Sequence, residues 1–183
     1  PDFDAMPAIP YPPDLLSATE QGQAHRVTAA EWPARRKQLA DLVEEYLLGH
    51  APPAPGNVRG VIEEKKQEEG QETWTVRLEF GPDHAAKLHC WLWLPPNFQK
   101  KPLPVFLVDN TNYTQFARAA FDQGRFLICV YNATDPAYRA DKQDESASYK
   151  DLFGKFDWSE FRRRGWSASR AVDWLRDLDF VAR

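Results

Sequence analysis

Three consecutive segments decide the fold of this chain: Leu103-Pro-Val-Phe-Leu-Val-Asp109, Asn110-Thr-Asn-Tyr-Thr-Gln-Phe-Ala-Arg-Ala-Ala-Phe-Asp-Gln-Gly124 and Arg125-Phe-Leu-Ile-Cys-Val-Tyr-Asn-Ala-Thr-Asp135. The first and last are short apolar runs rich in β-branched and aromatic residues, which is typical of strands buried on both faces. The middle segment predicts a helix over Asn112–Gln123, because Gly124 is a stop signal and the apolar residues recur at helical spacing. The residues of that apolar face are Tyr113, Phe116, Ala117, Ala120 and Phe121. This order predicts a parallel βαβ unit with a right-handed crossover.

Three strands are expected before this unit. Val58–Lys65 is the first, and Trp74–Phe80 follows with a strict alternation of apolar and polar residues, as in a half-buried strand. In Leu88–Leu94 both faces are apolar or aromatic, so we expect both to be covered. The fold class is therefore α/β, with an antiparallel meander that leads into a parallel sheet with flanking helices.

The N-terminal part is expected to be simpler. Residues 1–30 are rich in proline and lack periodicity, which predicts an extended arm. Thr28 and Glu31 form a capping-box pattern at the start of a helix. One face of that helix is apolar, and Gly49 ends it; the face comprises Leu39, Leu42, Val43, Tyr46 and Leu47.

A long polar loop, Asn132–Phe156, follows the last strand of the βαβ unit, and loops of this length are usually functional or disordered. Ligands of open sheets bind beyond the carboxyl ends of parallel strands. We therefore place Asp135, Tyr138 and Trp158 at the rim of a cleft. Asp157 or Ser159 can then cap a helix that runs to Leu178. Its expected apolar stripe is Phe161, Gly165, Ala168, Val172 and Leu175, widened by Ala171, Trp174 and Leu178.

Composition excludes several classes of partner. The chain has 183 residues and a net charge of -4, so a nucleic-acid partner has no electrostatic support. The basic run Arg162–Arg164 is interpreted as a solvated helix face. No apolar run is long enough to span a bilayer, and no signal peptide is visible. Cys90 and Cys129 lie in expected strands, which favours two buried free thiols over a disulfide and leaves the compartment open.

The sequence predicts neither a metal nor a cofactor. The four histidines lack ligand spacing, and phosphate-binding glycine loops are absent. His89 alternates within a strand and is expected to be structural. Asp141, Asp144 and Glu145 give a calcium hypothesis without EF-hand spacing, so we favour a solvated loop. Ser167 has helix on both sides, whereas a nucleophilic serine needs a sharp strand-to-helix turn.

Three stretches resemble one enzyme family. They are Phe126–Asp135, the run Phe156-Asp-Trp-Ser-Glu-Phe161 with Gly165-Trp-Ser-Ala-Ser-Arg-Ala-Val-Asp-Trp-Leu175, and Glu31-Trp-Pro33 with Leu47-Leu-Gly-His-Ala-Pro-Pro53. They are similar to bacterial α/β-hydrolases related to glucuronoyl esterases and acetylxylan esterases. The resemblance implies that residues 31–183 are the N-terminal half of an α/β-hydrolase three-layer sandwich and end before the nucleophile strand.

The same resemblance implies a site. In this family the nucleophile turn, the acid and the histidine come later in the chain, so no residue of this segment is assigned to the catalytic triad. The loop after Leu103–Val108 contributes a backbone N–H to the oxyanion hole of such hydrolases, which makes Asn110 and Thr111 candidates. In the alternative interpretation, Asn110 or Thr111 only caps the helix.

The expected function is part of a serine-type carboxylic ester hydrolase acting on glucuronoyl or acetyl esters of plant cell-wall carbohydrate. Its expected partners are a small or polymeric ester substrate and the C-terminal half of the same domain, on the same or a cleaved chain. The resemblance implies a secreted or periplasmic protein. The alternative is a non-catalytic chain with a hydrolase-like fold that binds carbohydrate or a partner, since the chain has seven tryptophans.

Overall fold

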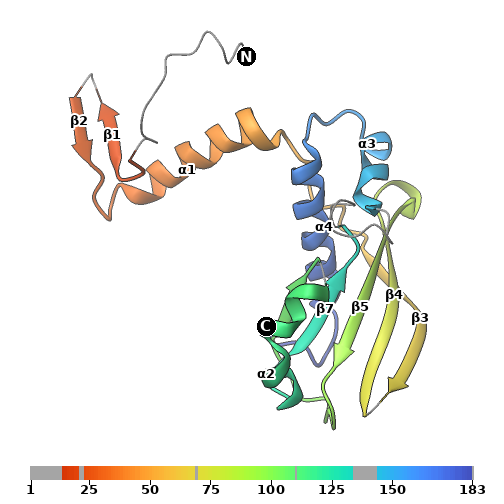
Figure 1. The fold of residues 1–183 in the computed structure, drawn as a ribbon. Helices are drawn as coiled ribbons and strands as arrows, with labels where there is room; N and C mark the ends of the chain where they lie inside the picture. The colour runs from red at the N-terminus through yellow and green to blue at the C-terminus, as the bar shows by residue number, and fades with distance from the viewer. Residues whose placement is uncertain (1–13, 21–22, 69, 110, 134–143, 183) are drawn as a thin grey trace. The chain divides into compact units, whose positions relative to one another are not determined.

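The computed structural model describes residues 14–20, 23–68, 70–109, 111–133 and 144–182 (Figure 1). Asn110, Asp135 and Tyr138 lie outside these residues. The chain divides into two compact units, Pro1–Leu47 and Leu48–Arg183, which we describe separately. Among the described residues, no helix is long and apolar enough to cross a membrane.

The first unit contains a hairpin of β1 (Ser17–Glu20) and β2 (Gln23–Arg26), in which Ser17 is the partner of Arg26. The expectation of an extended arm is therefore wrong for this segment. Backbone pairing stabilises the hairpin without an apolar pattern, and the pairing continues where the Val27 N–H donates to the Leu16 carbonyl at 2.6 Å.

The helix after this hairpin begins as the capping-box pattern predicts. The Glu31 carboxylate accepts hydrogen bonds from the Thr28 N–H and hydroxyl at 2.8 and 2.7 Å. Helix α1 (Trp32–Val43) follows and continues as a π-helical turn, η2 (Glu44–Leu48). Gly49 then ends it with φ +68°. Neither α1 nor η2 has a buried residue, so the expected apolar face is exposed.

The second unit is built on a five-stranded sheet in the order β3-β4-β5-β7-β6 (Figure 1). The strands are β3 (Arg59–Glu68), β4 (Gln71–Phe80), β5 (Ala86–Leu94), β6 (Val105–Val108) and β7 (Leu127–Tyr131). Strands β3, β4 and β5 form the predicted antiparallel meander, and β5 pairs antiparallel with β7. Strands β6 and β7 are parallel, with Val105 opposite Leu127, which confirms the βαβ unit.

The helical elements of this unit are short except for the last. They are η3 (Pro82–His84), η4 (Thr111–Phe116), α2 (Arg118–Asp122), η5 (Glu145–Ser148), α3 (Tyr149–Leu152) and α4 (Glu160–Leu175). Ser159 is the N-cap of α4, where its hydroxyl accepts a hydrogen bond from the Arg162 N–H at 3.2 Å.

The sheet has an apolar cluster on each face. On one face, alternate residues of β4 and β5 pack against α4, and this larger cluster includes both buried free cysteines, Cys90 and Cys129. On the other face, Phe121 of α2 packs with Val108, Ile128 and Val130. Strand β7 contributes to both clusters and is buried on both faces, as predicted.

The crossover segment differs from the single helix expected over Asn112–Gln123. A 3₁₀ helix, η4, runs to Phe116, and only α2 is α-helical. Because a 3₁₀ helix has three residues per turn, residues before and after the junction do not share one face. Phe116 is consequently 81% exposed, whereas Phe121 is fully buried.

The buried face of α4 also differs from the predicted stripe. Phe161 is 73% exposed and Val172 is exposed as well. The predicted residues Ala171, Trp174 and Leu175 are buried, and the other buried residues of α4 are Trp166, Ser167 and Arg170. The two tryptophans contribute the largest apolar surfaces, so they determine which side faces the sheet.

Candidate active site

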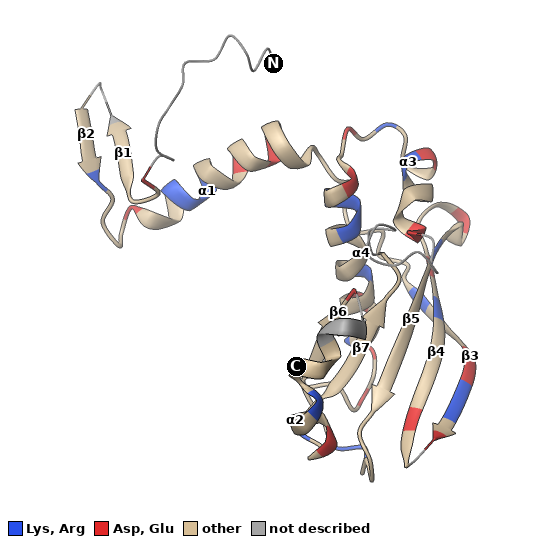
Figure 2. Cartoon of the chain, viewed as in Figure 1, with Lys and Arg blue, Asp and Glu red and all other residues tan. Residues whose placement is uncertain are grey.

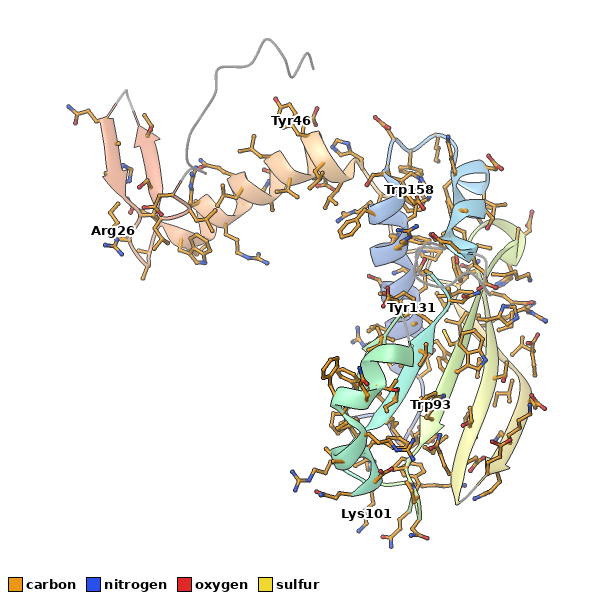
Figure 3. All side chains as sticks on the ribbon, viewed as in Figure 1. Arg26, Tyr46, Trp93, Lys101, Tyr131 and Trp158 are labelled. Atoms are coloured by element: carbon orange, nitrogen blue, oxygen red, sulfur yellow. The ribbon has the colours of Figure 1, made fainter. Side chains whose placement is uncertain are left out.

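The carboxyl ends of β6 and β7 lie at one edge of the sheet, because these strands are parallel and Val108 is opposite Val130. Asp109 follows β6, and β7 ends at Tyr131 (Figure 3). Burial and, to a smaller extent, the negative charge of Asp109 raise the pKa of the Tyr131 phenol to about 12. The phenol therefore stays protonated at neutral pH and is a hydrogen-bond donor at this edge.

The oxyanion candidates begin at the same edge. Thr111 is the first residue of η4, so the loop after β6 does open into a helical turn. Asn110 lies outside the described residues. This position agrees with a backbone N–H that faces a ligand and equally with a residue that only caps the turn.

The described end of the long loop returns to the carboxyl end of β7, where we expected it. The Asn132 N–H donates to the His89 carbonyl on β5 at 2.9 Å. Glu145 of η5 accepts hydrogen bonds from the His89 N–H at 2.6 Å and from the His89 Nδ1 at 2.5 Å. The other ring nitrogen, Nε2, is 3.3 Å from the Glu63 carboxylate of β3. His89 therefore links three elements through its backbone and both ring nitrogens.

Asp144 connects the same loop to α4. Its carboxylate accepts hydrogen bonds from the Ser146 N–H at 3.0 Å and hydroxyl at 2.6 Å, and from the Arg164 Nε at 2.8 Å. The interpretation of Asp144 and Glu145 as a solvated loop is wrong, since buried or half-buried partners hold both. Arg164, which also pairs with Glu160, is likewise not a purely solvated side chain. Within the described ranges, no group of three or more His, Cys, Asp or Glu residues could hold a metal ion.

Trp158, a predicted rim residue, lies in an aromatic cluster and is 6% exposed (Figure 3). Its ring centroid is 5.4 Å from that of Trp166 and 6.0 Å from that of Phe153, both in edge-to-face geometry. Its backbone pairs with Gly49 in an isolated bridge. Such packing makes Trp158 a structural side chain that fixes the end of the loop. Asp135 and Tyr138 remain predictions for the rim.

Ser167 lies inside α4, and its hydroxyl donates to the Arg163 carbonyl at 2.9 Å. It is fully buried and does not sit at a turn, so it lacks the geometry of a nucleophile. The linkage of His89 and Glu145 was not predicted. Its two residues are 56 positions apart, and the alternation within β5 indicates only the face of His89.

No protein-family model and no curated protein matches the chain. Several solved structures are similar to the chain. A glucuronoyl esterase from Solibacter usitatus is similar over 98% of this chain and 57% of its own, with a TM-score of 0.65 and 19% identity. A promiscuous CE15 esterase from a marine bacterial metagenome is similar over 97% of this chain and 56% of its own (TM-score 0.62, 19% identity). A putative acetyl xylan esterase from Bacteroides fragilis is similar over 84% and 45%, respectively (TM-score 0.50, 16% identity).

The chain thus spans about half the length of the solved structures that it matches. At these identities the similarity concerns the fold. The meander, the parallel β6–β7 pair and the flanking helices form an α/β fold that is shared with these esterase structures, which confirms the resemblance inferred from the sequence at the level of the fold.

Proposed function

We propose that Leu48–Arg183 form the first half of a serine-type carboxylic ester hydrolase domain that acts on glucuronoyl or acetyl esters of plant cell-wall carbohydrate. A following segment, on the same polypeptide or on a second chain, supplies the serine, the histidine and the acid. The structural neighbours, which are glucuronoyl and acetyl xylan esterases, support this choice of ester.

One observation supports the proposal most directly. Leu103, just before β6, pairs with Val181 in a parallel bridge: the Leu103 N–H donates to the Phe180 carbonyl at 3.0 Å, and the Ala182 N–H donates to the Leu103 carbonyl at 2.8 Å. The adjacent Pro104 carbonyl accepts from the Leu127 N–H on β7. The backbone groups of one residue in a strand point to the side opposite to those of the next residue, so Val181 lies on the side of β6 away from β7. The chain after α4 therefore returns to the free side of β6.

In a doubly wound sheet, a strand in that place ends at the same edge as β6 and β7. A serine on the turn after it would attack the ester carbonyl while a histidine takes the serine proton. The bond from carbon to the alcohol oxygen then breaks, and the alcohol leaves with that proton. Water hydrolyses the acyl-serine and restores the serine. This half of the domain contributes one wall of the cleft and an N–H of Asn110 or Thr111 toward the oxyanion.

The test compares residues 1–183 alone, the chain extended by its following segment, and a mixture of the two parts produced separately. The substrates are a benzyl ester of glucuronic acid, acetylated xylan and an aryl acetate. We expect hydrolysis by the extended chain and by the mixture, and none by residues 1–183 alone. Hydrolysis by residues 1–183 alone, or an extended chain inactive on all three esters, would overturn the proposal.

A further inference from the structure

A separate cleft lies on the α2 face of the sheet. Three neighbouring strands contribute one row of directly opposed residues to it: Lys66 on β3 is the partner of Thr73 on β4, which is the partner of Trp93 on β5. Glu68 and Gln71 form the next pair, and Arg118 of α2 completes the lining. The cleft has a volume of about 860 Å³. This volume falls within the range of small-molecule sites.

The position of the cleft separates it from the candidate active site. Trp93 is four residues beyond His89 on β5, a distance of about 13 Å at the usual rise per residue of a strand. Trp93 is opposite Ile128, near the amino end of β7, whereas the candidate active site lies at the carboxyl end. A ligand in this cleft would therefore not occupy the place of the reacting ester.

The lining of the cleft combines one aromatic side chain with hydrogen-bond donors, acceptors and charged groups. Trp93 is half-buried and packs against the apolar cluster under α2, so its ring is held in place (Figure 3). The Arg118 Nη1 donates to the Gln71 Oε1 at 3.3 Å and joins α2 to the tip of the β3–β4 hairpin. Lys66 and Arg118 are donors, Glu68 is an acceptor, and Thr73 and Gln71 are both. In Figure 2 the ribbons of β3 and α2 are coloured at positions of both basic and acidic residues.

We propose that this cleft binds a short segment of a carbohydrate chain. One face of a pyranose ring carries C–H groups that can lie flat on an indole, while its equatorial hydroxyls both donate and accept hydrogen bonds. An indole beside mixed donors and acceptors matches both properties. A wholly apolar ligand would leave the charges of Lys66, Glu68 and Arg118 without water. A polyanion would meet the carboxylate of Glu68.

The experiment measures binding of an unesterified, neutral xylo-oligosaccharide to the full protein by isothermal titration calorimetry. Because this ligand has no ester, failure here is distinguishable from failure of the proposed esterase activity. Trp93→Ala removes the indole, and Gln71→Ala removes a polar contact without touching the apolar cluster. Phe161→Ala is the control, since Phe161 is an exposed aromatic residue on α4, outside the cleft.

We expect Trp93→Ala to raise the Kd at least about tenfold and Gln71→Ala about threefold, with Phe161→Ala unchanged. Hydrolysis of a small soluble ester should be the same in Gln71→Ala and the unsubstituted protein. Circular dichroism establishes that each variant is folded. Wild-type affinity in folded Gln71→Ala and Trp93→Ala would overturn the inference, and so would the absence of binding of the xylo-oligosaccharide to the unsubstituted protein.

Discussion

Replacing Phe121 tests the structure of the crossover segment. Phe121 is fully buried on α2 and packs with Val108, Ile128 and Val130, while its ring lies 6.4 Å from that of Phe126. Loss of the apolar side chain costs about 1.5–3 kcal/mol of transfer free energy. The partners belong to paired strands that cannot collapse into the space, so a cavity term adds to this loss. We expect Phe121→Ala to lower the free energy of unfolding by about 3–5 kcal/mol.

The matched control is Phe116→Ala, the same substitution five residues earlier on an 81% exposed side chain. It should change the free energy of unfolding by no more than about 0.5 kcal/mol. Urea denaturation followed by tryptophan fluorescence measures both, and equal m-values show that the same surface is exposed on unfolding. A loss for Phe116→Ala comparable to that for Phe121→Ala would refute the 3₁₀ junction and support the continuous helix, in which both residues share one buried face.

Three further predictions follow from single sites. Thr111→Pro removes a backbone N–H at a helix start that tolerates proline. If that N–H binds the oxyanion, kcat of the extended protein should fall about 10²–10³-fold, whereas Thr111→Ala retains the N–H and should leave kcat unchanged. Gly49→Ala should lower the Tm of thermal unfolding more than Gly56→Ala. Both glycines have φ +68°, but a Cβ at Gly49 would lie 2.2 Å from the Asp157 carbonyl oxygen, whereas a Cβ at Gly56 would enter open space. Hydrogen bonds from Lys87 and, to a smaller extent, from other cationic side chains lower the pKa of Glu79 to about 2. The ionised carboxylate therefore stabilises the fold fully above about pH 4.5, and this contribution is lost as the pH falls toward 2. Glu79→Gln should consequently reduce the decrease of Tm over that pH range.

The sheet was predictable because its signals are local. Alternation in Trp74–Phe80 and the apolar run Leu127–Tyr131 each indicate a strand and its burial within a few residues. Pairing across β6 and β7 then follows from the handedness and length of the connection. The helices were less predictable, because a small change in helical phase is enough to place Phe116 or Phe161 on the surface instead of in the core. No pattern in the neighbouring sequence indicates the 3₁₀ turn before Ala117, or that Trp166 determines which face of α4 is buried.

The candidate site was predictable in position and not in detail. Strand order places Asp109 and Tyr131 at one edge, which pattern alone could show. The contact of Glu145 with His89 depends on the loop returning across the sheet, and the sequence around Glu145 reads as an ordinary acidic loop. Asp144 is similar, since only the structure places Arg164 beside it.

The edge of the sheet leads to the last prediction. Among the described strands, β6 is at the edge, and its pairing on the free side is limited to the bridge from Leu103 to Val181. Phe106 of β6 is 37% exposed. An apolar strand with unpaired backbone groups is a template for other chains, so residues 1–183 produced alone should self-associate as concentration rises. Phe106→Lys should reduce that association because edge charges oppose pairing, whereas Phe161→Lys on α4 should not. Light scattering over a concentration series measures this. A monomer at every concentration that unfolds cooperatively would contradict the prediction and show that β6 needs no further strand.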